Sequence, residues 1–153
     1  MRVLLLSLLH AFGSKHVFGA TDGKSGFALV QVVKPDLVVT DYAMQPVDGV
    51  EFVKMVRALN TPLACVPVIM VTGHTERHHI EQARDAGVTE FLIKPVTPRD
   101  LHLRLMEAIE RPRQFVRTPT FAGPDRRRKK MAHVAKRRST DHPADFELRS
   151  GRF

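Results

Sequence analysis

The run Asp36-Leu37-Val38-Val39-Thr40-Asp41 decides the fold class of this chain. Its apolar centre predicts a buried strand. The following residues, Tyr42-Ala43-Met44-Gln45-Pro46-Val47-Asp48-Gly49, combine proline, aspartate and glycine and predict a loop. We therefore expect Asp41 to end a strand and to place its carboxylate at one edge of a sheet.

Two later strands also end on polar residues. The run Val66-Pro67-Val68-Ile69-Met70-Val71 stops at Thr72, and Phe91-Leu92-Ile93 stops at Lys94. The nearly continuous apolar character of the first run is typical of a central parallel strand that is covered on both faces. Thr72 lies 31 residues after Asp41, and Lys94 lies 22 residues after Thr72.

Helix-like segments separate these strands. Apolar residues at helical spacing predict helices over 2–12, 26–33, 50–59 and 98–109, and Thr75 is the expected N-cap of another that ends at Ala86. A short strand is expected over 16–20 and a turn over 21–23. Strands that alternate with helices predict a doubly wound, parallel α/β sheet, in which ligands bind beyond the carboxyl ends of the strands. Asp41, Thr72 and Lys94 would share that edge.

The charge divides the chain into two parts. Residues 1–110 carry 11 Lys and Arg against 12 Asp and Glu, whereas 111–153 carry 13 against 4. The length suits one domain with an appendage. We expect a folded domain over 1–112 and a basic tail over 113–153 that is disordered when free, because its prolines and charges leave little apolar area to bury. Asp125 is a candidate cap for a short basic helix over 126–138.

Two further features bear on the cell compartment. The only cysteine, Cys65, excludes an internal disulfide and is expected to be buried at the start of a strand. No apolar run approaches the roughly 18 to 20 residues of a membrane helix, and His10 interrupts the apolar start that resembles a secretory signal. We expect a cytoplasmic protein without a membrane span.

The basic residues of the tail are clustered. A solubilising, disordered end is the simpler interpretation. The alternative is a contact with a polyanion, most simply the phosphates of nucleic acid, and an acidic protein or an anionic membrane would use the same charges. The candidate contacts are Arg126, Arg127, Arg128, Lys129, Lys130, Lys136, Arg137 and Arg138.

The three residues at the strand ends form a coherent set for phosphoryl transfer. A carboxylate can attack phosphorus and form an acyl phosphate. A hydroxyl such as that of Thr72, an ammonium such as that of Lys94 and a divalent cation would neutralise the charge on the phosphoryl oxygens. Taken singly, each residue is more often part of a turn, so only the combination indicates this chemistry.

Three motifs, at 36–49 (DLVVTDYAMQPVDG), 66–73 (VPVIMVTG) and 91–95 (FLIKP), resemble the receiver domain of two-component response regulators, the CheY-like family. The resemblance covers residues 1 to about 110. It implies a flavodoxin-like sheet in which Asp41 is the phosphoacceptor and Lys94 the phosphate-pairing lysine. It also implies that Thr72 is the switch hydroxyl and Phe91 the switch aromatic, and it suggests a cis peptide at Lys94-Pro95.

The start of the chain departs from that family. Receivers begin with an apolar strand that ends in an acidic pair, whereas residues 1–5 (MRVLL) here already align with the first helix. We therefore expect a sheet without the family's first strand, in a chain that is either a late-start version of a longer protein or a poor phosphate acceptor. The family implies Mg²⁺, but only Asp41 and the backbone carbonyl of Ala43 are left to bind it, so binding would be weak or absent. Asp48 is expected to serve the loop.

The leading functional hypothesis is a stand-alone response regulator of a bacterial phosphorelay, a phosphoprotein that is not an enzyme. By the resemblance, Asp41 would accept phosphate from a sensor histidine kinase or a phosphotransfer protein, and the chain would signal to a downstream protein target. The alternative is a phosphorylation-independent interaction or nucleic-acid-binding protein that acts through its basic tail. A hydrolase with Asp41 as nucleophile is disfavoured, because Ala43 stands where such enzymes carry a general acid.

A weaker signal is a group of histidines. His74 and His78 are four residues apart, and His79 is adjacent. They could share a helix face as metal ligands, but no third ligand at convincing spacing is visible. A solvated helix start is therefore favoured over a metal site.

Overall fold

The computed structural model describes residues 1–73 and 76–126. Its helices are α1 (Arg2–Ala11), α2 (Gly23–Val33), α3 (Gly49–Arg57), the 3-10 helix η1 (Pro62–Cys65), α4 (Arg77–Asp85) and α5 (Pro98–Glu110). Its strands are β1 (Val38–Asp41), β2 (Val68–Thr72), β3 (Glu90–Ile93), β4 (Phe115–Thr118) and β5 (Phe121–Pro124). Over these described ranges, no helix is long and apolar enough to cross a membrane.

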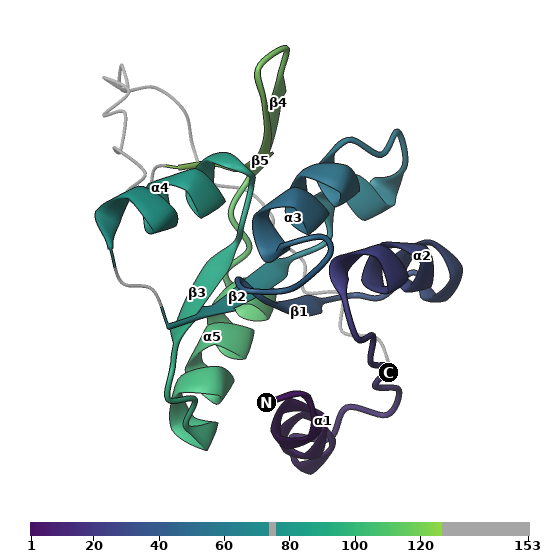
Figure 1. The fold of residues 1–153 in the computed structure, drawn as a ribbon, viewed down its shortest axis with the longest axis vertical. Helices are drawn as coiled ribbons and strands as arrows, with labels where there is room; N and C mark the ends of the chain where they lie inside the picture. The colour runs from purple at the N-terminus through teal and green to yellow at the C-terminus, as the bar shows by residue number, and fades with distance from the viewer. Residues whose placement is uncertain (74–75, 127–153) are drawn as a thin grey trace, which may run out of the picture.

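The first three strands form one parallel sheet in the order β1-β2-β3. All five residues of the central strand β2 are buried. Its alternate residues point to opposite faces, so Val68 and Met70 pack with residues of α2, α3 and α4, whereas Ile69 and Val71 pack with α5. Helices therefore cover both faces of the sheet (Figure 1), as the alternating pattern of the sequence predicts.

Side-chain caps fix where α2 and α5 begin, as Asp48 does for α3. Asp22 and Ser25 form a capping box at the start of α2, and the hydrogen bond from the Ser25 backbone lowers the pKa of Asp22. This box starts α2 at Gly23, so the predicted helix start at residue 26 is wrong, and the turn expected over 21–23 is a bend at 21–22 only. At α5, Thr97 accepts a hydrogen bond from the Asp100 N–H at 3.1 Å, and Pro98 is the first helical residue, as predicted. The expected cap Thr75 lies outside the described residues.

The short strand expected over 16–20 is wrong, because these residues form no regular element. Within the described residues the sheet ends at β1, and no strand over 16–20 pairs with that edge. Chain 16–20 instead links α1 to α2. Three leucines of α1 pack against the core cluster that lies between the sheet and α5, namely Leu5, Leu8 and Leu9.

The burial expected for Cys65 is also wrong, since this cysteine is exposed. It is the last residue of η1, and β2 begins only at Val68. The neighbouring Val66 is buried in its place. An apolar run in the sequence does not show at which of its residues the strand begins. Here the strand begins three residues after Cys65, and Cys65 therefore lies at the surface and not in the core.

The ordered structure continues beyond residue 112, so the expected boundary of a disordered tail at 113 is wrong. Strands β4 and β5 pair as an antiparallel hairpin (Figure 1). Arg117 of β4 donates to the backbone carbonyls of Arg57 (3.3 Å) and Leu59 (2.9 Å). Residues 113–153 are basic and polar on average, but this average does not show the short apolar segment around Phe115 and Phe121, which forms the hairpin.

Two glycines allow the hairpin to approach the body closely. A Cβ on Gly123 would lie 2.7 Å from the Cα of Gly87, and a Cβ on Gly87 would lie 2.6 Å from the carbonyl oxygen of Ala122. Gly87 also has φ +98°, which favours glycine. The hairpin contacts Gly87, which precedes β3, and its strand β5 contacts η1, which precedes β2, so the hairpin docks at the amino ends of the strands. The candidate site lies at the opposite ends.

Candidate functional site at the carboxyl ends of the strands

The structure brings the strand ends together as the sequence predicts. Asp41 is in register with Val71 of β2, and Thr72 is in register with Ile93 of β3. The backbone N–H of Lys94 donates to the Thr72 carbonyl at 2.9 Å. Thr72 and Lys94 therefore follow Asp41 along one edge of the sheet.

Asp41 and Lys94 form an ion pair. Lys94 Nζ lies 2.7 Å from Asp41 Oδ2, and the Ala43 N–H donates to Asp41 Oδ1 at 3.1 Å. The side chains of Asp41 and Lys94 are 26% and 31% exposed, so a small molecule in solution can reach both. The pair combines a carboxylate nucleophile with a cation that can stabilise charge on an incoming group. The Lys94-Pro95 peptide is cis, as the resemblance suggests.

The two expected switch residues lie just inside this edge. Thr72 is buried at 3% exposure. Phe91 is half-buried in β3 and packs against the core that α2, α3 and α4 cover. The structure places Thr72 directly beside Lys94, whose N–H donates to the Thr72 carbonyl, and Phe91 in register with Met70 in the same sheet, and the switching role of both residues remains a prediction.

Gly49 lies directly against the backbone of Asp41. A Cβ on Gly49 would meet the carbonyl group of Asp41, with the carbonyl carbon at 3.0 Å, and would be 3.0 Å from the Cα of Tyr42. The Gly49 N–H also donates to the Tyr42 carbonyl at 3.0 Å. The first residue of α3 therefore fixes where β1 ends, and only glycine fits there.

The carboxylates near the site do not form a usual magnesium site. In the described part of the chain, Asp41 belongs to no group of three His, Cys, Asp or Glu side chains that could hold a metal ion. Asp48 instead caps α3, where it accepts a hydrogen bond from the Glu51 N–H at 2.7 Å, as expected for a loop residue. One carboxylate, already paired with Lys94, and the carbonyl of Ala43 are a poor donor set for Mg²⁺.

Tyr42 is a site neighbour that the sequence reasoning missed. Its hydroxyl lies 2.6 Å from His79 Nδ1 and donates to Gln82 Oε1 at 3.3 Å. Desolvation first, and the charge of Asp48 second, raise the pKa of the Tyr42 phenol. Tyr42, the residue next to Asp41, is thereby connected with helix α4. A contact across 37 residues leaves no local signal in the sequence.

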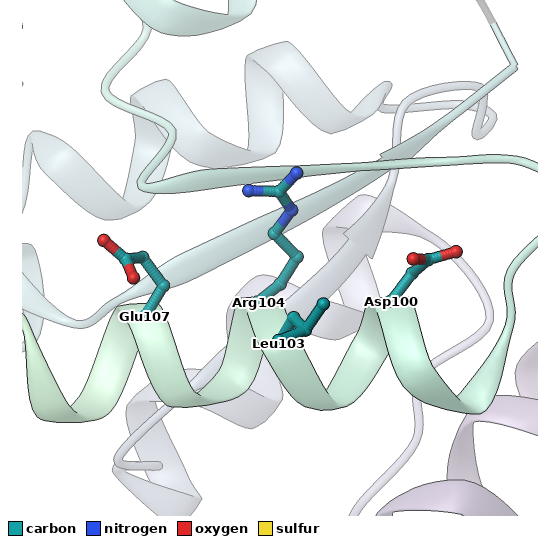
Figure 2. A pocket seen from close by; sticks show the side chains of 4 residues that line it. All are labelled: Asp100, Leu103, Arg104 and Glu107. Atoms are coloured by element: carbon teal, nitrogen blue, oxygen red, sulfur yellow. The ribbon is translucent and has the colours of Figure 1, made fainter.

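A shallow pocket elsewhere on the surface has no connection with this site. Figure 2 shows its lining residues Asp100, Leu103, Arg104 and Glu107 along one face of α5. One helix supplies all four side chains, and Arg104 pairs with the buried Glu90 at 3.4 Å. We assign no ligand to this pocket.

Only the first of the candidate polyanion contacts lies within the described residues. Arg126 pairs with Asp85 at 3.3 Å, and its guanidinium lies 4.2 Å from the centre of the Phe121 ring. Arg126 therefore holds the C-terminal end of the hairpin against helix α4. The other seven, Arg127, Arg128, Lys129, Lys130, Lys136, Arg137 and Arg138, lie outside the described residues, as does the predicted basic helix beyond Arg126. A polyanion contact remains a prediction.

Comparisons with known proteins agree with this geometry. The family model for the response regulator receiver domain matches residues 1–106. Chemotaxis protein CheY-3 of Vibrio cholerae is 32% identical over 111 residues, which cover 72% of this chain and 85% of that protein.

Solved structures give the same fold. Vibrio cholerae CheY4, crystallised at low pH, has a TM-score of 0.66 and 29% identity, with 71% of this chain and 88% of that chain covered. The receiver domain of sensor histidine kinase PA1611 from Pseudomonas aeruginosa, with a magnesium ion in its active site cleft, has a TM-score of 0.62 and 22% identity, with 69% and 84% covered. The architecture is thus flavodoxin-like α/β.

Proposed function

The chain belongs to the response regulator receiver domain family and so has a role in two-component signalling, and from this premise we propose that Asp41 is its phosphoacceptor. The observation that supports this proposal is the 2.7 Å pair of Asp41 and Lys94 at the carboxyl ends of the strands. The chain would act in the cytoplasm as a stand-alone switch and not as an enzyme. The donor would be a sensor histidine kinase or a phosphotransfer protein.

The proposed transfer is an in-line displacement on phosphorus. A carboxylate oxygen of Asp41 attacks the phosphoryl group of a phosphohistidine, the new O–P bond forms, and the N–P bond of the donor breaks. The electron pair of that bond stays on the imidazole nitrogen, which takes up a proton. Lys94 leaves the carboxylate and pairs with a phosphoryl oxygen, where its charge stabilises the transferred group.

The output would come from a change at the same edge. An acyl phosphate on Asp41 adds negative charge beside Lys94 and the Thr72 hydroxyl, which can donate to a phosphoryl oxygen. Thr72 and Phe91 would then move together and change the surface that a downstream protein binds. In this proposal the chain signals by protein–protein interaction.

Mg²⁺ is the cofactor that we propose, with weak binding. The receiver domain of PA1611 holds a magnesium ion in its active site cleft. Here the candidate ligands are the Asp41 carboxylate and the Ala43 carbonyl, supplemented by oxygens of the phosphodonor. When bound, the ion would neutralise phosphoryl charge. Because the donor set is small, we expect Asp41 to accept phosphate slowly.

Labelling with phosphoramidate, a small donor with an N–P bond, tests the proposed function. Intact mass and peptide mapping should show one phosphoryl group on Asp41. Lys94→Ala should slow labelling roughly 100-fold, because a positioned cation is lost from the transferred group. Lys54→Ala, on the exposed surface of α3, is the matched control and should label at the wild-type rate. Absence of label on the wild-type chain, or equal rates for both lysine variants, would contradict the proposal.

Gly49→Ala should impair the same reaction through backbone geometry. The added Cβ collides with the backbone of Asp41 and Tyr42 and displaces the nucleophile. A displacement of about 1 Å can cost about 100-fold in rate, and the strain should lower the free energy of unfolding by roughly 1–3 kcal/mol. The measurements are the labelling rate and urea unfolding.

Gly26→Ala is the matched control for this substitution. Its Cβ would have ordinary contact with Phe52 at 3.5 Å, and alanine suits the interior of α2. This variant should label normally and be no less stable than the wild type. A wild-type labelling rate for Gly49→Ala would show that its Cβ is accommodated without moving Asp41.

A further inference from the structure

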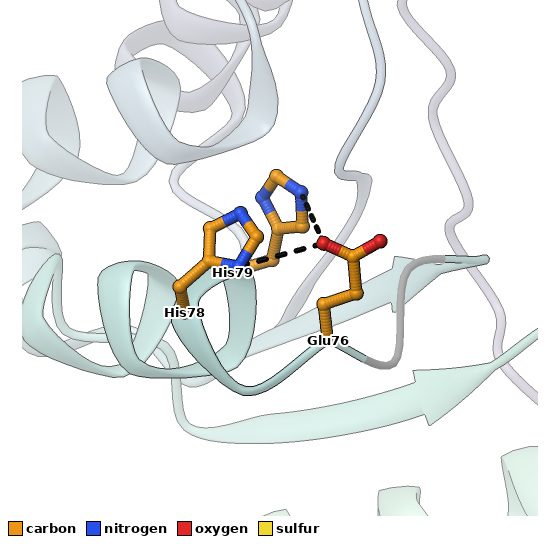
Figure 3. Close-up of side chains that lie close together, drawn as sticks. All are labelled: Glu76, His78 and His79. Atoms are coloured by element: carbon orange, nitrogen blue, oxygen red, sulfur yellow. Dashed lines mark ion pairs between the residues drawn. The ribbon is translucent and has the colours of Figure 1, made fainter.

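We propose that Glu76, His78 and His79, at the start of α4, form a binding site for a transition-metal cation of the Zn²⁺ class. The site is separate from the pair of Asp41 and Lys94 and does not depend on the proposed phosphoryl transfer. Each residue offers one ligand atom, and these three atoms all lie within 4.8 Å of one another. Figure 3 shows both imidazole rings beside the carboxylate of Glu76.

The two distances from the carboxylate to the imidazole nitrogens are close to those around a tetrahedral ion. Glu76 Oε2 lies 3.5 Å from His78 Nδ1 and 3.8 Å from His79 Nε2. Zinc binds nitrogen and oxygen at about 2.0–2.1 Å, so its tetrahedral ligands lie roughly 3.4 Å apart. Small rotations of exposed side chains would close the remaining gap. Three protein ligands would leave the fourth position to water or to another molecule.

The helix start holds the three residues in this arrangement. Glu76 is the N-cap of α4, and its carbonyl accepts hydrogen bonds from the His79 N–H (3.1 Å) and the Ile80 N–H (3.3 Å). The ligand spacing therefore follows from the first turn of a helix. The spacing of the histidines in the sequence pairs His74 with His78, and the third ligand of the structure is Glu76, a carboxylate that precedes His78 and His79. His74 lies outside the described residues.

A hydrogen bond orients the ring of His79. The Tyr42 hydroxyl lies 2.6 Å from His79 Nδ1 and donates to Gln82 Oε1 at 3.3 Å. A metal on Nε2, the atom that faces Glu76, requires the proton of the neutral imidazole to be on Nδ1, where the N–H would donate to the Tyr42 oxygen. Metal-bound histidines usually donate their second N–H to such a partner, which fixes the ring and strengthens the ligand. The 5.2 Å edge contact between the rings of Tyr42 and His79 adds to this positioning.

The competing interpretation is a solvated helix start. Glu76 and His78 are exposed, and a protonated histidine could pair with the carboxylate without any metal. The contact between His79 and Tyr42 favours the metal site, because it fixes one ligand before an ion arrives. An ion there would also be linked through His79 to Tyr42, the residue beside Asp41.

Titration of the full chain with Zn²⁺ alone, followed by calorimetry, tests the site, and Co²⁺ absorption reports the coordination geometry. We expect one tight site whose affinity falls more than about tenfold in His79→Gln, His78→Gln and Glu76→Gln. Tyr42→Phe should weaken binding about 10- to 100-fold, the usual effect of losing a partner of a metal-bound histidine. A merely structural histidine would not produce a tetrahedral cobalt spectrum.

Two control variants make the result decisive. His102→Gln removes an exposed histidine of α5 and should leave the affinity unchanged. Asp41→Asn should also bind Zn²⁺ normally, which separates this site from the proposed phosphoacceptor. Equal affinity of the wild type, His78→Gln and His79→Gln would overturn the proposal, and so would an equal loss in His102→Gln.

Discussion

Replacing Asp41 by asparagine is expected to abolish phosphoryl labelling and to leave the fold intact. An amide has no charged oxygen that can attack phosphorus, so no acyl phosphate can form. Phosphoramidate should therefore add no phosphoryl group to this variant, while the wild type is labelled. Intact mass measured over time gives the rate for both proteins, and this complete loss is the largest effect we expect at the site.

The stability of the Asp41 variant should change little. Asparagine can still accept the hydrogen bond from the Ala43 N–H, which is 3.1 Å from Asp41 Oδ1 in the native protein. The lost ion pair with Lys94 is about a quarter to a third exposed, and such pairs contribute roughly 1 kcal/mol or less. Urea unfolding should therefore give nearly the same midpoint. Loss of labelling without loss of stability would identify a missing nucleophile.

Asp48→Asn is the matched control, seven residues further along the same loop. Asp48 caps α3 through the Glu51 N–H, and asparagine is an equally good N-cap. This variant should be labelled at the wild-type rate. If it lost the label while the Asp41 variant kept it, the nucleophile would be Asp48 and the assignment of Asp41 would be wrong.

The positions of the strand ends could be predicted from the sequence, because each strand is a short apolar run that stops at a polar residue. The apolar run that ends at Thr72 forms a strand buried on both faces, and Asp41 and Lys94 end the strands on either side of it. Parallel strands bring their carboxyl ends to one edge, so spacing along the chain was enough to place the three residues together. The 2.7 Å pair of Asp41 and Lys94 follows from this rule.

The features that escaped prediction depend on contacts between distant segments. The hairpin of β4 and β5 was missed because its Phe115 and Phe121 are embedded in a basic, proline-containing stretch. Tyr42 meets His79 across 37 residues. Arg57 looks in the sequence like any cation in the last turn of a helix, a position that normally faces water.

Arg57→Ala is expected to destabilise the protein by about 3–5 kcal/mol, the scale on which buried charged networks fail when one member is removed. The Arg57 side chain is almost fully enclosed, with 3% exposure. Nη1 donates to the carbonyls of Ala64 and Val66 at 2.7 Å each, and Nε and Nη2 donate to the Gly87 carbonyl at 3.0 and 2.9 Å. One guanidinium thus joins the end of α3 to the segments that lead into β2 and β3.

Alanine would leave three buried carbonyls without their donor and a cavity where the side chain packs beneath Phe115. Folded domains are stable by only about 5–15 kcal/mol, so a large share of the protein would be unfolded by mild heating. The urea midpoint measures the loss. Arg57→Lys should recover only part of it, because a single ammonium cannot span carbonyls that a planar guanidinium reaches. Arg99→Ala, exposed on α5, is the control and should change stability by no more than about 0.5 kcal/mol.

The pH dependence of stability separates the charge of Arg57 from its packing. Burial lowers the pKa of Arg57 well below that of a solvated guanidinium, to about 10 in the folded protein. Below pH 10, Arg57 is charged in both the folded and the unfolded protein. It therefore does not make the free energy of unfolding depend on pH, and the full cost of desolvating its charge is present in the folded protein. Above about pH 10, and until the guanidinium of the unfolded chain also loses its proton, the unfolded chain binds one more proton than the folded protein, so Arg57 should make stability rise with pH. The difference in urea midpoint between wild type and Arg57→Ala should therefore be constant from pH 6 to 9 and widen above 10, and a difference that narrows there would contradict the burial of a charged guanidinium.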